Sequence, residues 1–60
     1  MPFIVNYASF RTDIPNYQIF PTLQKAEKYF DWMRENRKDL EVKPPLAISE
    51  KQANELIIGS

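Results

Sequence analysis

The segment from residue 22 to residue 38 constrains the fold most, because it is the only stretch long and periodic enough to form a substantial amphipathic helix. At about 100° per residue its apolar side chains fall on one stripe, with Tyr29 at the edge of that stripe. Thr22 is a suitable N-cap, and we expect the helix to end between Asn36 and Asp39, with Asn36 as a candidate to stop it in a left-handed conformation. The stripe that we expect to face the core consists of Leu23, Ala26, Phe30 and Met33.

Two segments before this helix predict an antiparallel β-hairpin. Residues 3–10 alternate β-branched and aromatic side chains between two faces, and residues 17–20 form a second short stretch of the same kind. Residues 11–16 between them predict a loop, in which Pro15 and Asn16 suit the central positions of a β-turn. One face of the first strand is wholly apolar, so we expect it to pack against the helix. This face carries Phe3, Val5 and Tyr7.

The segment after the main helix, residues 39–48, contains a short apolar alternation that Pro44 and Pro45 interrupt. Proline has no N–H to donate, and it pushes the residue before it into an extended conformation. The segment is therefore an edge strand or a polyproline-like connector but not a central strand. Of these two, we expect the extended connector.

A second helix is predicted near the end of the chain. Ser49 and Gln52 form the S-x-x-Q pattern of a capping box, so the helix should start at Glu50, and Gly59 is well placed to end it. A helix of roughly nine residues is not stable alone and must pack on the rest of the protein. Its apolar residues are Ala53, Leu56 and Ile57.

Together these segments predict a small α+β fold with a single domain over residues 1–60, in the order β-β-α-(β)-α. A chain of this length buries only about 60% of the surface that its unfolded form exposes. There is no cysteine, so no disulfide adds stability, and the packing of four Phe, three Tyr and one Trp has to supply much of it.

Composition argues against catalysis. The sequence has neither histidine nor cysteine, which removes the usual general base, the most reactive nucleophile and the commonest metal ligands. The single glycine excludes a glycine-rich phosphate-binding loop. Glu27, Asp31 and Glu35 share one face of the main helix and could in principle bind Mg²⁺ or Ca²⁺, but a solvated face is the simpler interpretation. We expect no enzymatic activity, no cofactor and no metal site.

Charge and hydropathy exclude further classes of protein. Eight basic and eight acidic residues cancel, so no overall field attracts the chain to nucleic acid or to an anionic membrane. No run approaches the 18 or more apolar residues of a membrane span, and the first residues lack the features of a signal peptide. We therefore expect a cytoplasmic protein.

Trp32 is the residue that most suggests a function. It lies off the apolar stripe, beside Tyr29, and either later apolar segments cover it or it is an exposed anchor for a partner protein. Apolar residues left over after one hairpin face is covered, notably Ile4, Phe10 and Phe20, favour the second possibility. We expect a small protein-interaction module, a regulator, inhibitor or accessory subunit, with homodimerisation through the sheet edge or second sheet face as a related possibility. The candidate partner-binding residues are Trp32, Tyr29, Lys28, Phe10 and Phe20.

The alternative hypothesis is a small nucleic-acid-binding protein that uses a basic cluster at the end of the main helix. Acidic residues are interleaved with this cluster, and basic residues at a helix C-terminus also serve to compensate the helix dipole. Nucleic-acid binding is therefore the less favoured function. The cluster consists of Arg34, Arg37, Lys38 and Lys43.

Overall fold

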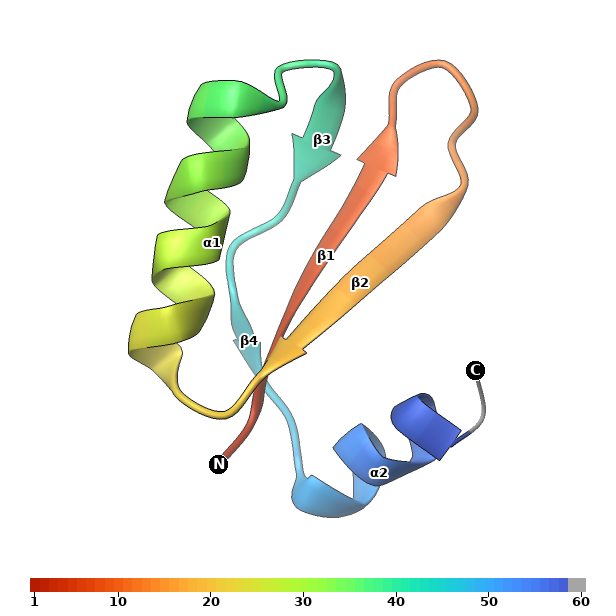
Figure 1. Cartoon of the computed structure of the whole chain (residues 1–60). Coiled ribbons are helices and arrows are strands. Elements are labelled where there is room, and N and C mark those ends of the chain that lie inside the picture. The colour runs from red at the N-terminus through yellow and green to blue at the C-terminus, as the bar shows by residue number, and fades with distance from the viewer. Residues whose placement is uncertain (59–60) are drawn as a thin grey trace.

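The chain folds around one antiparallel sheet of four strands, with two helices packed against it (Figure 1). The computed structural model describes residues 1–58, and the side chains of residues 1–57. The α+β class and the predicted order of elements are confirmed. The elements are β1 (Phe3–Ser9), β2 (Pro15–Phe20), α1 (Leu23–Asn36), β3 (Leu40–Val42), β4 (Leu46–Ala47) and α2 (Glu50–Ile58).

Strand β1 is the central strand of the sheet. β2 runs antiparallel along one side of it, in a register that extends from Phe3 opposite Phe20 to Ala8 opposite Pro15. β3 and β4 run antiparallel along its other side, β3 against the C-terminal end of β1 and β4 against the N-terminal end. The sheet therefore has one continuous edge, formed by β2, and one edge divided between two short strands.

The hairpin loop is shorter than predicted, because β2 already begins at Pro15. Both Pro15 and Asn16 are paired with β1, so the predicted β-turn at these residues is wrong. The chain reverses around Asp13 instead, whose φ is 55° and whose N–H donates to the carbonyl oxygen of Ser9 at 2.9 Å. Aspartate tolerates the left-handed region better than most residues, and proline can occupy the first position of an edge strand.

The boundaries of α1 follow from its capping residues. The Thr22 hydroxyl oxygen accepts a hydrogen bond from the N–H of Lys25 at 3.3 Å, which confirms the predicted N-cap. The helix ends at Asn36, inside the predicted interval, and Arg37 is the C-cap. The predicted left-handed stop at Asn36 is wrong. Asn36 stays helical, and its side-chain amide donates to the carbonyl oxygen of Trp32 at 2.9 Å.

The core between α1 and the sheet is centred on Val5, which is 0% exposed. Ala26 and Met33 of α1 are buried against it, and Phe30 is half-buried at their side. Leu23 is 43% exposed, so its predicted place in the core is wrong. On the helix Leu23 lies about 60 to 80° away from the two buried residues, toward solvent.

Aromatic rings line the rest of this interface. The Tyr29 ring lies 6.5 Å from the Tyr7 ring and 5.1 Å from the Phe20 ring, measured between centroids. Tyr7 belongs to the apolar face of β1 and Phe20 lies opposite Phe3 on the same face. The prediction that this face meets the helix is therefore confirmed.

The proline-containing segment after α1 is not a simple connector, because it supplies both β3 and β4. Pro44 and Pro45 fall between the two strands, where no ladder hydrogen bond from their nitrogens is required. The N–H of Lys43 donates to the carbonyl oxygen of Asn6 at 2.8 Å, and the N–H of Ile48 donates to that of Pro2 at 3.0 Å. The expected connector is thus a pair of short edge strands.

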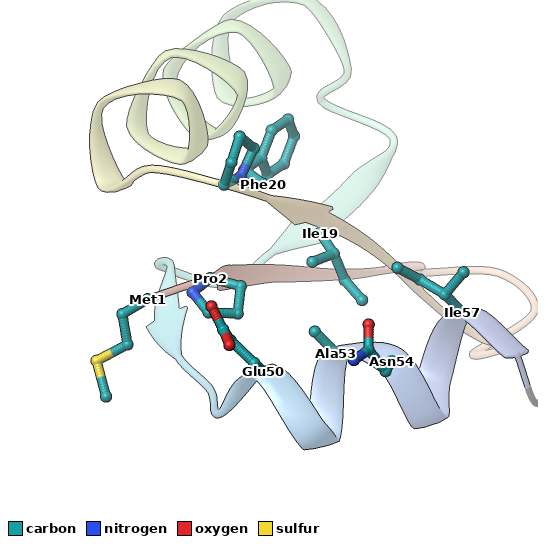
Figure 2. A pocket seen from close by; sticks show the side chains of 9 residues that line it. Met1, Pro2, Ile19, Phe20, Glu50, Ala53, Asn54 and Ile57 are labelled. Carbon is teal, nitrogen blue, oxygen red and sulfur yellow. The ribbon is translucent and has the colours of Figure 1, made fainter.

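Helix α2 packs on the face of the sheet opposite α1 (Figure 2). It starts at Glu50 as predicted, and the N–H of Gln52 donates to the Ser49 hydroxyl oxygen at 3.1 Å. Ala53 is buried and Leu56 half-buried, but Ile57 is exposed, so the predicted apolar face of α2 is only partly covered. The predicted stop at Gly59 lies outside the described residues.

Candidate functional site

Trp32 lies on the outer flank of α1 and is 54% exposed. This exposure shows that the interpretation in which later apolar segments cover Trp32 is wrong, and α2 in particular packs on the other face of the sheet (Figure 2). Residues one or two helical turns away along the same side of α1 are exposed as well. We call this surface the Trp32 flank, and it consists of Lys25, Lys28, Trp32 and Asn36.

Tyr29 and Phe20, which were expected to bind a partner beside Trp32, lie beneath this flank. Both are half-buried, and their rings contact each other between α1 and the sheet. Burial first, and then the neighbouring Tyr7 phenol, raise the pKa of Tyr29 above its usual range. The expectation that Phe20 is left over after one face is covered is wrong, because the register with Phe3 places it on the covered face.

Phe10 is highly exposed, but it lies far from the other candidates. It follows β1 at the hairpin loop, at the opposite end of the sheet from Phe20, and its N–H points to the carbonyl oxygen of Asp39 at 3.5 Å. The five predicted partner-binding residues therefore do not form one surface. Trp32 and Lys28 are adjacent and exposed. Tyr29 and Phe20 lie between α1 and the sheet, beneath these two residues, and Phe10 lies at the other end of the sheet.

One member of the basic cluster of the alternative hypothesis, Arg37, is neutralised by an ion pair. The Arg37 guanidinium donates to both carboxylate oxygens of Asp39, at 3.2 Å each. These hydrogen bonds hold the pKa of the Asp39 carboxyl below its usual range. Arg34 lies over the Phe30 ring, 5.3 Å from its centroid.

Acidic residues separate the remaining basic groups. A polar pocket of about 510 Å³ on the outer face of α1 brings two basic and two acidic side chains together. Lys43 lies beyond the end of β3, in a different pocket that also contains Glu41. No uniform positive surface results from this arrangement. The polar pocket on α1 is lined by Asp31, Arg34, Glu35 and Lys38.

A groove of about 520 Å³ lies between α2, the end of β2 and the first residues of the chain (Figure 2). Ile19, Ala53 and Ile57 converge on it from β2 and α2, whereas the Phe20 ring points to the α1 side. Glu50 is the only charged side chain in its lining. The groove is suited to an apolar side chain or a small apolar ligand with a hydrogen-bond donor. The lining residues are Met1, Pro2, Ile19, Phe20, Pro21, Glu50, Ala53, Asn54 and Ile57.

Sequence reasoning missed this groove because its walls come from opposite ends of the chain. The spacing of Ala53 and Ile57 already indicated an apolar side of α2. The strand that meets this side depends on which face of the sheet α2 covers, and no local pattern encodes that choice. Alternation along β2 assigns Ile19 to the face opposite Phe20, which was the one available signal.

Within residues 1–58, no group of three or more His, Cys, Asp or Glu side chains is placed to hold a metal ion. Neither helix in this part of the chain is long and apolar enough to cross a membrane. No family model, curated protein or solved structure matches the chain, so its function is inferred from the residues on its own surface.

Proposed function

We propose that the chain is a small non-enzymatic protein-interaction module, a regulator, inhibitor or accessory subunit, that acts by occupying a surface of another protein. The observation that carries this proposal is the exposure of Trp32, the only tryptophan of the chain. A tryptophan ring buries on the order of 150 to 250 Å² when enclosed, so a chain this short of core forgoes much stability by leaving it in water. A partner surface that encloses the ring recovers this contribution on binding.

The charges around Trp32 specify the chemistry of the partner. Lys25 and Lys28 lie on either side of Trp32 on the helix surface, and the exposed Glu35 lies one turn beyond Trp32, so basic side chains outnumber acidic ones around the indole. A complementary surface has an apolar pocket for the indole, bordered by Asp or Glu side chains. Complementary charge also speeds association at low salt, because it steers the two proteins toward each other.

The absence of catalytic chemistry from the sequence supports a binding role. The chain has no histidine and no cysteine. Of its hydroxyl groups, those of Thr22 and Ser49 accept hydrogen bonds as helix caps. Both of these hydroxyl groups therefore already have a structural role.

The test uses the intrinsic fluorescence of Trp32 to report partner binding. A tagged chain is used to capture a partner from the source organism, and the purified partner is then titrated while the tryptophan emission is recorded. We expect the emission to shift to the blue as the indole leaves water. We expect Trp32→Ala to weaken binding by about thirtyfold, the loss that corresponds to about 2 kcal/mol at a hot spot.

Leu46→Ala is the matched control, because Leu46 is similarly exposed but lies on β4. It should leave the affinity unchanged. The proposal fails if Trp32→Ala binds as tightly as the unmodified chain, or if it destabilises the fold as much as Phe30→Ala does. Binding to random DNA or RNA that weakens steeply between two salt concentrations would instead support the nucleic-acid hypothesis.

A further inference from the structure

The outer edge of β2 carries backbone groups whose directions can be derived from the rest of the sheet. The carbonyl oxygen of Asn6 accepts from the N–H of Lys43, so the polar groups of Asn6 point away from β2. Successive residues of a strand point their N–H and C=O to opposite sides, so Val5 and Tyr7 bond to β2. Their partners in the register are Gln18 and Asn16.

It follows that Tyr17 and Ile19 direct their N–H and C=O groups outward. No hydrogen bond to these outward groups occurs within residues 1–58. Edge strands in soluble proteins are usually protected by charge, by proline or by shortness. The opposite edge of this sheet has such protection, since β3 and β4 are short and prolines separate them. The edge formed by β2 lacks it, because β2 has six residues, none of them charged, and proline only at its first position.

We propose that the β2 edge pairs with the β2 edge of a second copy of this chain, antiparallel about a two-fold axis at Gln18. This register places Tyr17 of each copy opposite Ile19 of the other. Each such pair exchanges two N–H···O=C bonds, so four hydrogen bonds form and every outward N–H and C=O of the two residues is satisfied. The result is one continuous sheet through both copies, formed by a surface distinct from the Trp32 flank.

The side chains at this edge can pack against the same edge of a second copy of the chain. Gln18 meets Gln18 of the second copy across the axis, where their amides can donate to and accept from each other. Tyr17 and Ile19 lie on the α2 side and form an aromatic to β-branched cross-strand pair. They face a pocket of about 230 Å³ beside the edge, lined by Tyr17, Gln18, Ile19, Leu56 and Ile57.

Surface area and charge are compatible with a second copy as the occupant. The chain exposes 4684 Å². A folded monomer of its mass is expected to expose about 4,100 Å², which leaves an excess of roughly 600 Å². Stable interfaces bury roughly 600 to 1,000 Å² per partner, so the excess is of the size that dimerisation would hide. The formal net charge is zero, so two copies do not repel each other.

The first experiment tests the axis at Gln18 by sedimentation equilibrium at low salt. Gln18→Lys and Gln18→Glu each place two like charges directly opposite one another, and we expect each to raise the dimer dissociation constant by up to about fivefold. Mixing the two variants pairs opposite charges and should restore dimerisation. Gln24→Lys, an equally exposed glutamine on α1, is the control and should dimerise normally.

Amide hydrogen exchange provides an independent measurement of the edge. The amides of Tyr17 and Ile19 should exchange fast in dilute samples and slowly in concentrated ones, whereas those of Asn16 and Gln18 should be protected in both. Trp32→Ala should change none of these results. A chain that stays monomeric, or a dimer insensitive to charge at Gln18, overturns the proposal. Protection of Tyr17 and Ile19 only by a different protein would show that the edge takes a foreign strand.

Discussion

The two faces of the sheet are covered to different degrees. On the α1 face, Val5 is 0% exposed, Met33 is 3% exposed, and an aromatic cluster centred on Tyr29 fills the remaining space. On the α2 face, Ala53 and Ile4 are the buried residues among the described side chains of residues 1–57. The difference arises because α1 has fourteen residues and α2 has nine, so α1 presents more apolar side chains to the sheet.

We infer from this difference that the α1 face supplies most of the stability of the protein, whereas the α2 face can change its conformation more easily. The α1 face holds Val5, Ala26, Met33 and the aromatic cluster around Tyr29, and therefore most of the favourable burial. α2 is too short to be stable alone, so it depends on its contacts with the sheet and should open at a lower free energy than the rest. A surface that opens locally is also one that can adapt to a ligand in the groove beside α2.

The largest expected effect comes from Met33→Ala on the α1 face. Methionine truncations in cores cost about 2 to 5 kcal/mol, and a domain of this size has only about 3 to 5 kcal/mol in total, so the variant should be largely unfolded at room temperature. Urea unfolding followed by circular dichroism measures the change. The matched control is Leu46→Ala, which is exposed and should change stability by less than about 0.5 kcal/mol. Equal losses from both variants would contradict the assignment of the core to the α1 face.

A smaller and more local effect is expected from Tyr17→Phe on the α2 face. The Tyr17 hydroxyl donates to the carbonyl oxygen of Leu56 at 3.0 Å, across 39 residues of chain. Removing this bond should cost about 0.5 to 1.5 kcal/mol, mostly as easier opening of α2. Amide exchange should accelerate in α2 and stay unchanged in α1. Uniform acceleration through both helices would show that the two faces unfold as one unit.

The parts of the fold that follow from sequence are those set by local chemistry. Thr22 and Ser49 accept the hydrogen bonds that start each helix, and both starts were predicted correctly. The apolar face of β1 was also correct, because alternation along a strand depends only on neighbouring residues. The off-stripe angle of Trp32 placed it on the flank of the helix, but the sequence left open whether later apolar segments cover it.

The parts that could not be predicted depend on partners distant in sequence. Leu23 fits the helical stripe but is 43% exposed, because the part of the stripe that the sheet covers is not encoded in the helix sequence. Pro44 and Pro45 indicated a break, yet both flanking segments pair with β1 because its second edge was open. The groove beside α2 emerges only from the assembled topology. An exposed sheet edge was expected from the sequence, but the strand that supplies it, β2, follows from how β3 and β4 pair with β1.

The smallest expected effect is a pH dependence confined to the α1 face. Burial and the Tyr7 phenol raise the pKa of Tyr29 in the folded state, while Arg37 acts in the opposite direction more weakly. A raised folded pKa means that the stability contribution is complete below the unfolded value of about 10 and is lost as pH rises through the folded pKa. Unfolding measured from pH 9 upward should therefore show a steeper loss for the unmodified chain than for Tyr29→Phe, which has no phenol to ionise. Parallel curves for the two proteins would mean that the Tyr29 hydroxyl reaches solvent, and the α1 face would then be less closed than its aromatic contacts indicate.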